Sequence, residues 1–208
     1  MSTIAQSYEI FAGEDLIEEM QTASRLTPAP GLTLEQASKL AQGRSFELVN
    51  GRMIFKMSDA KHSDAQGLLC GELVAYFKTN PIGRVRPEFT LRLWPDKPNE
   101  SRVPDLSVIL NESLQQDARY GTHAPDLAIE IVSHDDSWGA LFEKVNLYFE
   151  KGSRVVWLVD PSQGGIWVIS KEGRRWETNT LTCPELLPGF SVNVQDIFSW
   201  PSPSVHAE

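Results

Sequence analysis

Two acidic residues and a lysine stand where their side chains could act together on a phosphodiester. Glu130 interrupts the apolar run 126–132, which otherwise is typical of a buried strand. A carboxylate there needs a partner or a metal ion, because burying an unpaired charge is costly. Asp105 lies near the beginning of a second strand-like segment, 102–110, and Lys144 follows downstream. If the two strands are neighbours, both carboxylates can bind one divalent cation, which takes oxygen ligands at roughly 2.0–2.6 Å.

Helical geometry places Lys144 near these acids. The helix predicted over 137–151 carries its apolar side chains in one arc of roughly 120°, and Lys144 lies about 40° outside the edge of that arc. Glu143 points nearly the opposite way. Lys144 can therefore reach the strand ends, where an ammonium would stabilise charge developing on a phosphate. Taken alone, it also fits a boundary lysine that extends to water.

Two further residues are candidates for the same site. Glu88 lies in the strand-like segment that precedes the one with Asp105, so it could be an additional metal or water ligand. The alternative is an exposed residue paired with Arg86 or Arg102. His62 begins a predicted helix and could contact phosphate or act as an acid near neutral pH. For His62 the alternative is a capping or surface role.

The chain around these candidates alternates strands and helices. Asn50-Gly51 predicts the type I′ turn of a β-hairpin, and Thr33 with Gln36 predicts a capped helix start. The strand–helix–strand order over 125–160 predicts a right-handed, parallel βαβ crossover. The expected elements are helices at 15–25, 33–43, 62–79 and 137–151, strands at 84–93, 102–110, 125–132 and 154–160, and hairpins at 45–57 and 165–178.

Composition and charge restrict the class of protein. With 41% hydrophobic and 23% charged residues, no stretch approaches the roughly 20 apolar residues of a membrane span, and the start does not resemble a signal peptide. We therefore expect a cytoplasmic protein with two separate, reduced thiols, Cys70 and Cys183. The net charge of −9 argues against nonspecific coating of nucleic acid. Residues 52–102 nevertheless carry nine basic and six acidic side chains, either as a phosphate-contacting face or as ordinary solvated charges.

A longer ordered set of residues resembles a known family. Pro104 and Asp105 are followed by the run 130–133 and then by Lys144. The other members of the set are Tyr148, Gly152, the runs 157–161 and 187–190, and the hairpin residues 46–51. In this order they resemble the Uma-two type of restriction endonuclease, a branch of the PD-(D/E)XK nuclease superfamily, over residues 45–198.

The resemblance implies a fold, a cofactor and a substrate. The fold is α/β (α+β), a restriction-endonuclease-like core with a mixed central sheet flanked by helices. The cofactor is magnesium or manganese, the substrate is DNA, and a homodimer would suit an enzyme that cuts two strands. The superfamily's lysine usually stands two positions after the second acid, which is Val132 here, so the resemblance implies that Lys144 has taken the role. We expect a helical extension over 1–44, a nuclease domain over 45–198 and a flexible tail over 199–208.

Three functions compete for these residues. The first is a metal-dependent DNA endonuclease, in which Asp105 and Glu130, with Glu88, bind the ion and a metal-activated water attacks the phosphodiester. The second is an inactive nuclease-fold protein that binds nucleic acid or another protein, which the net charge makes credible. The third is glycoside hydrolysis, which needs an aromatic-lined cleft, whereas the six tryptophans are scattered along the chain. The intact acids and Lys144 favour the first.

Overall fold

The computed structural model describes residues 31–113, 119–134 and 136–200. The helix expected at 15–25 and most of the expected tail lie outside these ranges. The elements in chain order are α2 (Leu34–Leu40), β1 (Phe46–Val49), β2 (Arg52–Phe55), α3 (Ala60–Thr79), β3 (Gly83–Pro87), β4 (Leu106–Leu110), η1 (Asn111–Ser113), β5 (Leu127–Ile131), α4 (Trp138–Glu150), β6 (Val155–Asp160), β7 (Gly165–Ser170), β8 (Gly173–Glu177), β9 (Thr180–Cys183), β10 (Leu187–Asn193) and α5 (Val194–Phe198). None of these helices is long and apolar enough to cross a membrane.

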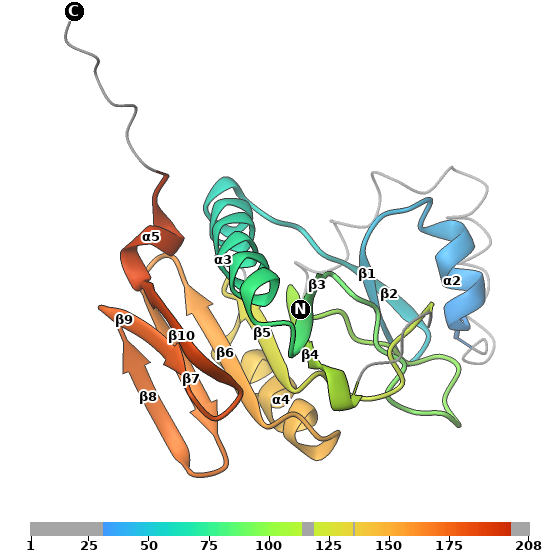
Figure 1. Cartoon of the computed structure of the whole chain (residues 1–208). Helices are drawn as coiled ribbons and strands as arrows, with labels where there is room; N and C mark the ends of the chain where they lie inside the picture. The colour runs from blue at the N-terminus through green and yellow to red at the C-terminus, as the bar shows by residue number, and fades with distance from the viewer. Residues whose placement is uncertain (1–30, 114–118, 135, 201–208) are drawn as a thin grey trace, which may run out of the picture.

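Six strands form one mixed sheet in the order β3-β4-β5-β6-β7-β8. β5 and β6 are parallel and are connected by α4, which confirms the predicted crossover. The other neighbouring strands of this sheet pair antiparallel. Figure 1 shows α3 and α4 packed against the sheet. The expected mixed sheet flanked by helices is therefore confirmed.

The two faces of β5 pack against different helices. Leu127, Ile129 and Ile131 join a buried cluster with the apolar side chains of α3. Ala128 joins a second cluster with those of α4. Because side chains alternate along a strand, Glu130 lies on the Ala128 side, next to α4. The alternation predicted for this strand is confirmed, and it places the Glu130 carboxylate on the face of β5 that α4 covers.

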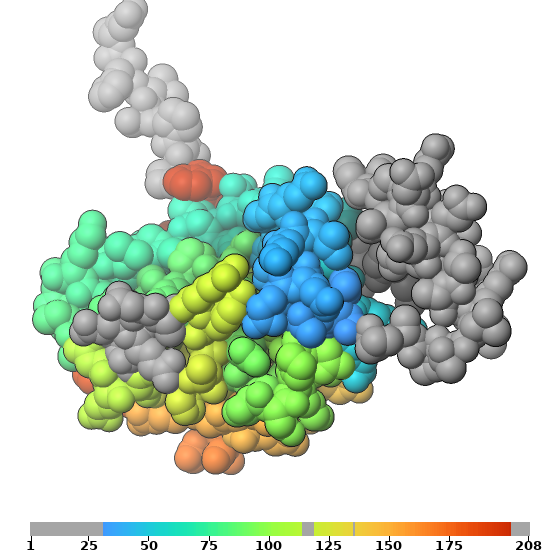
Figure 2. Space-filling model, turned by 90° about the vertical axis from the view of Figure 1, so that its right-hand side faces the viewer, coloured from blue at the N-terminus to red at the C-terminus, as the bar shows by residue number. Residues whose placement is uncertain are grey.

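β1 and β2 form a separate hairpin, as predicted. Asn50 and Gly51 have φ values of 51° and 74°, the positive values that a type I′ turn requires. Thr33 and Gln36 form the predicted capping box of α2, which packs on the hairpin. In Figure 2, α2 and the hairpin (blue) lie against the segment between β3 and β4 (green). This contact brings the hairpin to the part of the chain that carries Asp105.

The strands before and after this segment are shorter than predicted. β3 ends at Pro87, because Glu88 has a positive φ of 45° that a regular strand does not allow. β4 begins only at Leu106, and Pro104 lacks the backbone N–H that a ladder would use. Asp105 thus lies immediately before β4 rather than inside a longer strand.

The C-terminal strands β9 and β10 and helix α5 were not predicted. β10 contains Pro188 and Gly189, residues that usually signal a turn, and the pairing register shifts between Leu187 and Ser191. A bulge thus accommodates both residues inside a paired strand.

α4 leaves part of its apolar arc exposed. Trp138 and Phe142 are 43% and 40% exposed and contact each other with ring centroids 6.0 Å apart. They line a shallow hollow with Trp167, Ile169 and Arg174 of the sheet's far strands. Of the predicted apolar arc, Leu141, Val145 and Tyr148 are buried against the sheet, whereas Trp138 and Phe142 face this hollow.

Candidate active site

The β4–β5 register brings the two predicted acids together. Leu106 pairs with Ile129 in an antiparallel ladder, so the next step along that ladder places Asp105 beside Glu130. The Ile131 N–H donates to Asp105 Oδ2 at 2.7 Å, which anchors this carboxylate at the end of β5. Asp105 and Glu130 are only 1% and 3% exposed. The prediction that strands with these residues are neighbours is confirmed.

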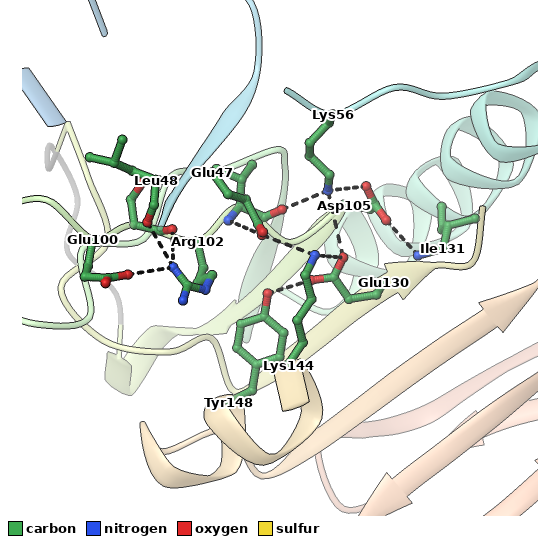
Figure 3. Close-up of polar contacts among 12 residues, drawn as sticks. Glu47, Leu48, Lys56, Glu100, Arg102, Asp105, Glu130, Ile131, Lys144 and Tyr148 are labelled. Carbon is green, nitrogen blue, oxygen red and sulfur yellow. Dashed lines mark hydrogen bonds and ion pairs between the residues drawn. The ribbon is translucent and has the colours of Figure 1, made fainter. Parts of the chain in front are cut away.

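α4 supplies two donors to Glu130 from successive turns. The Tyr148 hydroxyl donates to Glu130 Oε1 at 2.6 Å, and Lys144 Nζ lies 3.4 Å from Oε2. Lys144 and Tyr148 are four residues apart, so both side chains point from the same side of the helix. Glu143 is exposed, as helical geometry predicted. Figure 3 shows both donors pointing at the Glu130 carboxylate. The predicted reach of Lys144 is therefore confirmed, whereas its chemical role stays a prediction.

The hairpin contributes two charged residues that the sequence reasoning missed, Glu47 and Lys56. Glu47 Oε1 lies 3.2 Å from Lys144 Nζ and accepts a hydrogen bond of 3.1 Å from the Val103 N–H. Lys56 Nζ donates to Asp105 Oδ1 and lies 3.9 Å from Glu130 Oε2. One signal was available: Glu47 stands among apolar neighbours, as Glu130 does.

Polar contacts hold the hairpin in this position. Arg102 Nη1 donates to the Leu48 carbonyl at 3.0 Å and to Glu100 Oε2 at 3.1 Å. Glu100 Oε1 in turn accepts from the Asn50 N–H at 3.0 Å. Figure 3 shows this group beside the site. Because Arg102 and Glu100 tie the end of β1 and the turn that follows it to the loop before β4, Glu47 is fixed relative to Asp105.

His62 joins the site from the first turn of α3. Its Nε2 lies 3.3 Å from Asp105 Oδ2, and its ring is buried rather than at the surface. Asp59 caps the helix by accepting from the His62 N–H at 2.8 Å. One turn later, Gln66 donates to the Asp105 carbonyl at 3.0 Å. The buried Nδ1 of His62 has no hydrogen-bond partner among the described residues.

Glu88 is not brought into this group. It is exposed just after β3, and only its backbone N–H is in contact with the site segment, donating to the Asp105 carbonyl at 3.0 Å. Arg102, one of the partners considered for it, pairs with Glu100 instead. The predicted role of Glu88 as a ligand gains no support from its position.

The two central carboxylates have opposite pKa shifts. Burial disfavours the charged form of Asp105, but the His62 hydrogen bond and the Lys56 charge overcome this and lower its pKa to about 2. Burial dominates at Glu130 and raises its pKa, although Lys144 and Lys56 oppose the shift. Asp105 is therefore the firmly ionised member of the pair, and Glu130 is the member that takes up a proton more readily.

The donors of the site keep their protons. Burial works against the charged form of Lys144, but Glu130 and Glu47 reverse the effect and raise its pKa. Burial likewise opposes charged Lys56, and the neighbouring carboxylates again raise the pKa. Burial raises the pKa of Tyr148 well above its ordinary value, and Glu130 adds to the shift. Lys144 and Lys56 are therefore positively charged at neutral pH, and Tyr148 keeps its proton and acts as a hydrogen-bond donor.

The donor set fits a hard divalent cation with water ligands. Asp105 Oδ1, Glu130 Oε2 and the Val103 carbonyl all face the Lys56 ammonium, so a cationic group already lies among three oxygens. Mg²⁺ usually takes one or two carboxylates and retains several waters. Within the described residues, no cluster of three or more His, Cys, Asp or Glu side chains is arranged to hold a metal. Two carboxylates plus water are thus the set that this site offers.

Comparison with known families identifies the chain's relatives. Residues 33–195 match the model of the Uma2 family, described as "Putative restriction endonuclease". The chain belongs to this family. The match covers the hairpin, both central acids and Lys144, so the resemblance noted from the sequence is confirmed. Membership supports a nuclease of the restriction-endonuclease-like class.

Solved structures support the fold. A protein from Anabaena variabilis, described as "a putative nuclease belonging to DUF820", superposes with a TM-score of 0.69 at 24% identity, covering 81% of this chain and 98% of that one. The restriction-endonuclease-like core is therefore confirmed as the fold. A DrdV–DNA complex aligns with a TM-score of 0.31 at 11% identity over 68% of this chain and 14% of that one, too weak a likeness to argue from. No curated protein matches.

Proposed function

We propose that the protein is a metal-dependent DNA endonuclease whose site is built on Asp105, Glu130 and Lys144. The observation that carries the proposal is the β4–β5 register, which sets two buried carboxylates side by side within reach of a lysine. Two buried acids at one strand end are costly to a fold unless they bind a cation. The family match supports phosphodiester hydrolysis as the chemistry of the proposal.

Each residue of the site has a definite task in this proposal. Asp105 and Glu130 would hold a magnesium or manganese ion, which supplies an activated water and polarises the phosphate. Lys144, fixed between Glu130 and Glu47, stabilises negative charge that develops on the phosphate oxygens. It remains protonated at neutral pH, so it serves as a cation and not as a base. Tyr148 orients the Glu130 carboxylate through its hydroxyl.

Plasmid cleavage tests the proposal. Supercoiled DNA is incubated with Mg²⁺ or Mn²⁺ and wild type, Asp105→Asn or Glu130→Gln, and nicked and linear products are quantified. We expect wild type to nick the plasmid and each variant to lose activity by on the order of 100-fold or more, as when a transition-state-stabilising group is removed. Glu143→Gln is the matched control, because Glu143 lies next to Lys144 but is exposed. Cleavage by Glu130→Gln at the wild-type rate would refute the assignment.

A non-catalytic function is the second candidate, and one observation favours it. Lys56 and Lys144 already neutralise most of the carboxylate charge, so the site is closed by ion pairs without a metal. In that case wild type would bind DNA or a protein but leave plasmid intact with any divalent ion. Metal-independent DNA retention in a gel-shift assay, combined with no cleavage, would favour this candidate over the nuclease.

A homodimer remains part of the proposal because cutting both strands of a duplex needs two sites. Light scattering coupled to size-exclusion chromatography gives the mass directly. We expect a mass near twice the 23.3 kDa of the chain, at least when DNA is bound. A monomeric mass, together with slow conversion of nicked to linear DNA, would contradict the proposed homodimer.

A further inference from the structure

Lys56 occupies the point at which the two central carboxylates converge. Its ammonium donates to the Val103 carbonyl at 2.8 Å and to Asp105 Oδ1, and lies 3.9 Å from Glu130 Oε2. These acceptors are all hard oxygens, the kind that a divalent ion prefers. In Figure 3 the Lys56 side chain enters from the hairpin side and ends between the two acids. The ammonium therefore stands where a shared metal ion would have to bind.

Lys144 has a different relation to the same acids. It lies between Glu130 and Glu47, at 3.4 Å and 3.2 Å, and no contact joins it to Asp105. The five side chains thus alternate in charge, in the order Asp105, Lys56, Glu130, Lys144 and Glu47. Of these two lysines, Lys56 is the one that bridges the pair that would share a metal.

We propose that Lys56 is a displaceable internal cation, which holds Asp105 and Glu130 together in the metal-free protein and must leave before a divalent ion binds. This inference rests on the proposed metal-dependent function. A metal ion and an ammonium cannot occupy the same oxygens, and they repel each other at such short range. Lys56 has a path outwards, because it follows β2 in the segment before α3 and its side chain is 17% exposed.

Displacement has a measurable consequence for metal affinity. Binding of the ion must break the hydrogen bond from Lys56 to Asp105, and breaking one charge-assisted hydrogen bond corresponds to about a tenfold change in an equilibrium constant. Replacing Lys56 by methionine keeps the length of the side chain and removes the competing charge. The Lys56→Met protein should therefore bind Mg²⁺ and Mn²⁺ about tenfold more tightly, or better.

Calorimetric titration of chelator-treated protein with Mg²⁺ and Mn²⁺ tests this on wild type and three variants. Lys144→Met removes a charge beside Glu130 without vacating the shared position, so its gain should be smaller than that of Lys56→Met. Lys61→Met removes an exposed charge of α3 and should bind as wild type does. Equal affinities of wild type and Lys56→Met would overturn the inference, and so would an equal gain in Lys144→Met.

A second measurement uses the wild-type protein and does not depend on the folding of a variant. An amine-acylating reagent is applied with and without Mn²⁺, and mass spectrometry follows acetylation of Lys56, with Lys61 as internal reference. Displacement predicts at least several-fold faster acetylation of Lys56 at saturating metal and no change at Lys61. Unchanged Lys56 labelling in metal-saturated protein would overturn the inference.

The outcomes separate this inference from the proposed function. Metal binding that is equal in wild type and Lys56→Met leaves the nuclease proposal intact and removes only the role of Lys56. Binding to Lys56→Met but not to wild type supports displacement and counts against a metal-dependent wild-type enzyme. Absence of binding to both proteins would overturn the two together.

Discussion

The hydrogen bond from Tyr148 to Glu130 predicts a large stability loss when a single oxygen atom is removed. Tyr148→Phe keeps the buried ring and deletes the hydroxyl that donates to Glu130 Oε1 at 2.6 Å. Both residues are fully or almost fully buried, so no water can easily replace the donor. A buried hydrogen bond to a charged acceptor contributes roughly 1.5–3 kcal/mol. We expect the variant to lose about 2 kcal/mol in unfolding free energy.

Equilibrium unfolding in urea at pH 7, with chelator present, measures this loss. In a thermal scan of the same samples, 1 kcal/mol corresponds to roughly 2–4 °C in Tm for a chain of this size, so Tm should fall by about 4–8 °C. Tyr76→Phe is the matched control, because Tyr76 donates to the Pro188 carbonyl at 2.9 Å in a more exposed position. It should lose well under about 1 kcal/mol, since its acceptor is neutral. A Tyr148→Phe loss no greater than that of Tyr76→Phe would refute the reasoning.

Three further predictions follow from the pKa shifts. The pKa of Asp105 falls from 3.8 to about 2 on folding, so its ionisation contributes about 2 kcal/mol of stability above pH 4 that is lost as pH falls towards 2. Urea unfolding between pH 2 and 6 should show this slope in wild type, and an equal slope in Asp105→Asn would contradict it. Burial raises the pKa of Glu130, so its ionised form costs stability at neutral pH. With chelator present, Glu130→Gln should therefore unfold at a urea concentration at least as high as wild type does. A loss of more than about 2 kcal/mol in unfolding free energy would count against this. Burial raises the pKa of Cys183 to about 12, so a thiol reagent should label the partly exposed Cys70 first, and prior labelling of Cys183 in peptide maps would contradict the burial.

The central acids could be predicted because their positions depend on local pattern. Alternation along β5 sets the face of Glu130, and the pairing of consecutive strands sets Asp105 beside it. Helical periodicity likewise placed Lys144 on the side of α4 from which its side chain reaches Glu130. These rules need only the sequence around each residue. The αβ order, the two hairpins and the crossover followed for the same reason.

The sequence marks Glu47 as an acid among apolar neighbours, but the places of Glu47 and Lys56 beside the central acids could not be predicted, because they depend on where a hairpin docks. β1 and β2 do not belong to the main sheet, so strand pairing gives no register between the hairpin and β5. The docking is set by contacts of Arg102 and Glu100 with the hairpin backbone, which no local pattern encodes. Glu88 was misplaced for a related reason. Its backbone has a positive φ that ends β3, so its side chain lies at the surface although its strand precedes the one next to Asp105.

The surroundings of Val132 bear on the proposed transfer of the lysine's role to Lys144. Val132, which stands where the superfamily's lysine is expected, donates its N–H to the Val159 carbonyl and packs with the apolar cluster under α4. A lysine at this position would replace that apolar contact. Lys144 reaches Glu130 Oε2 at 3.4 Å from the helix that covers the same face. An ammonium thus reaches the second acid from α4, and Val132, just after β5, keeps its apolar contact with the cluster under that helix.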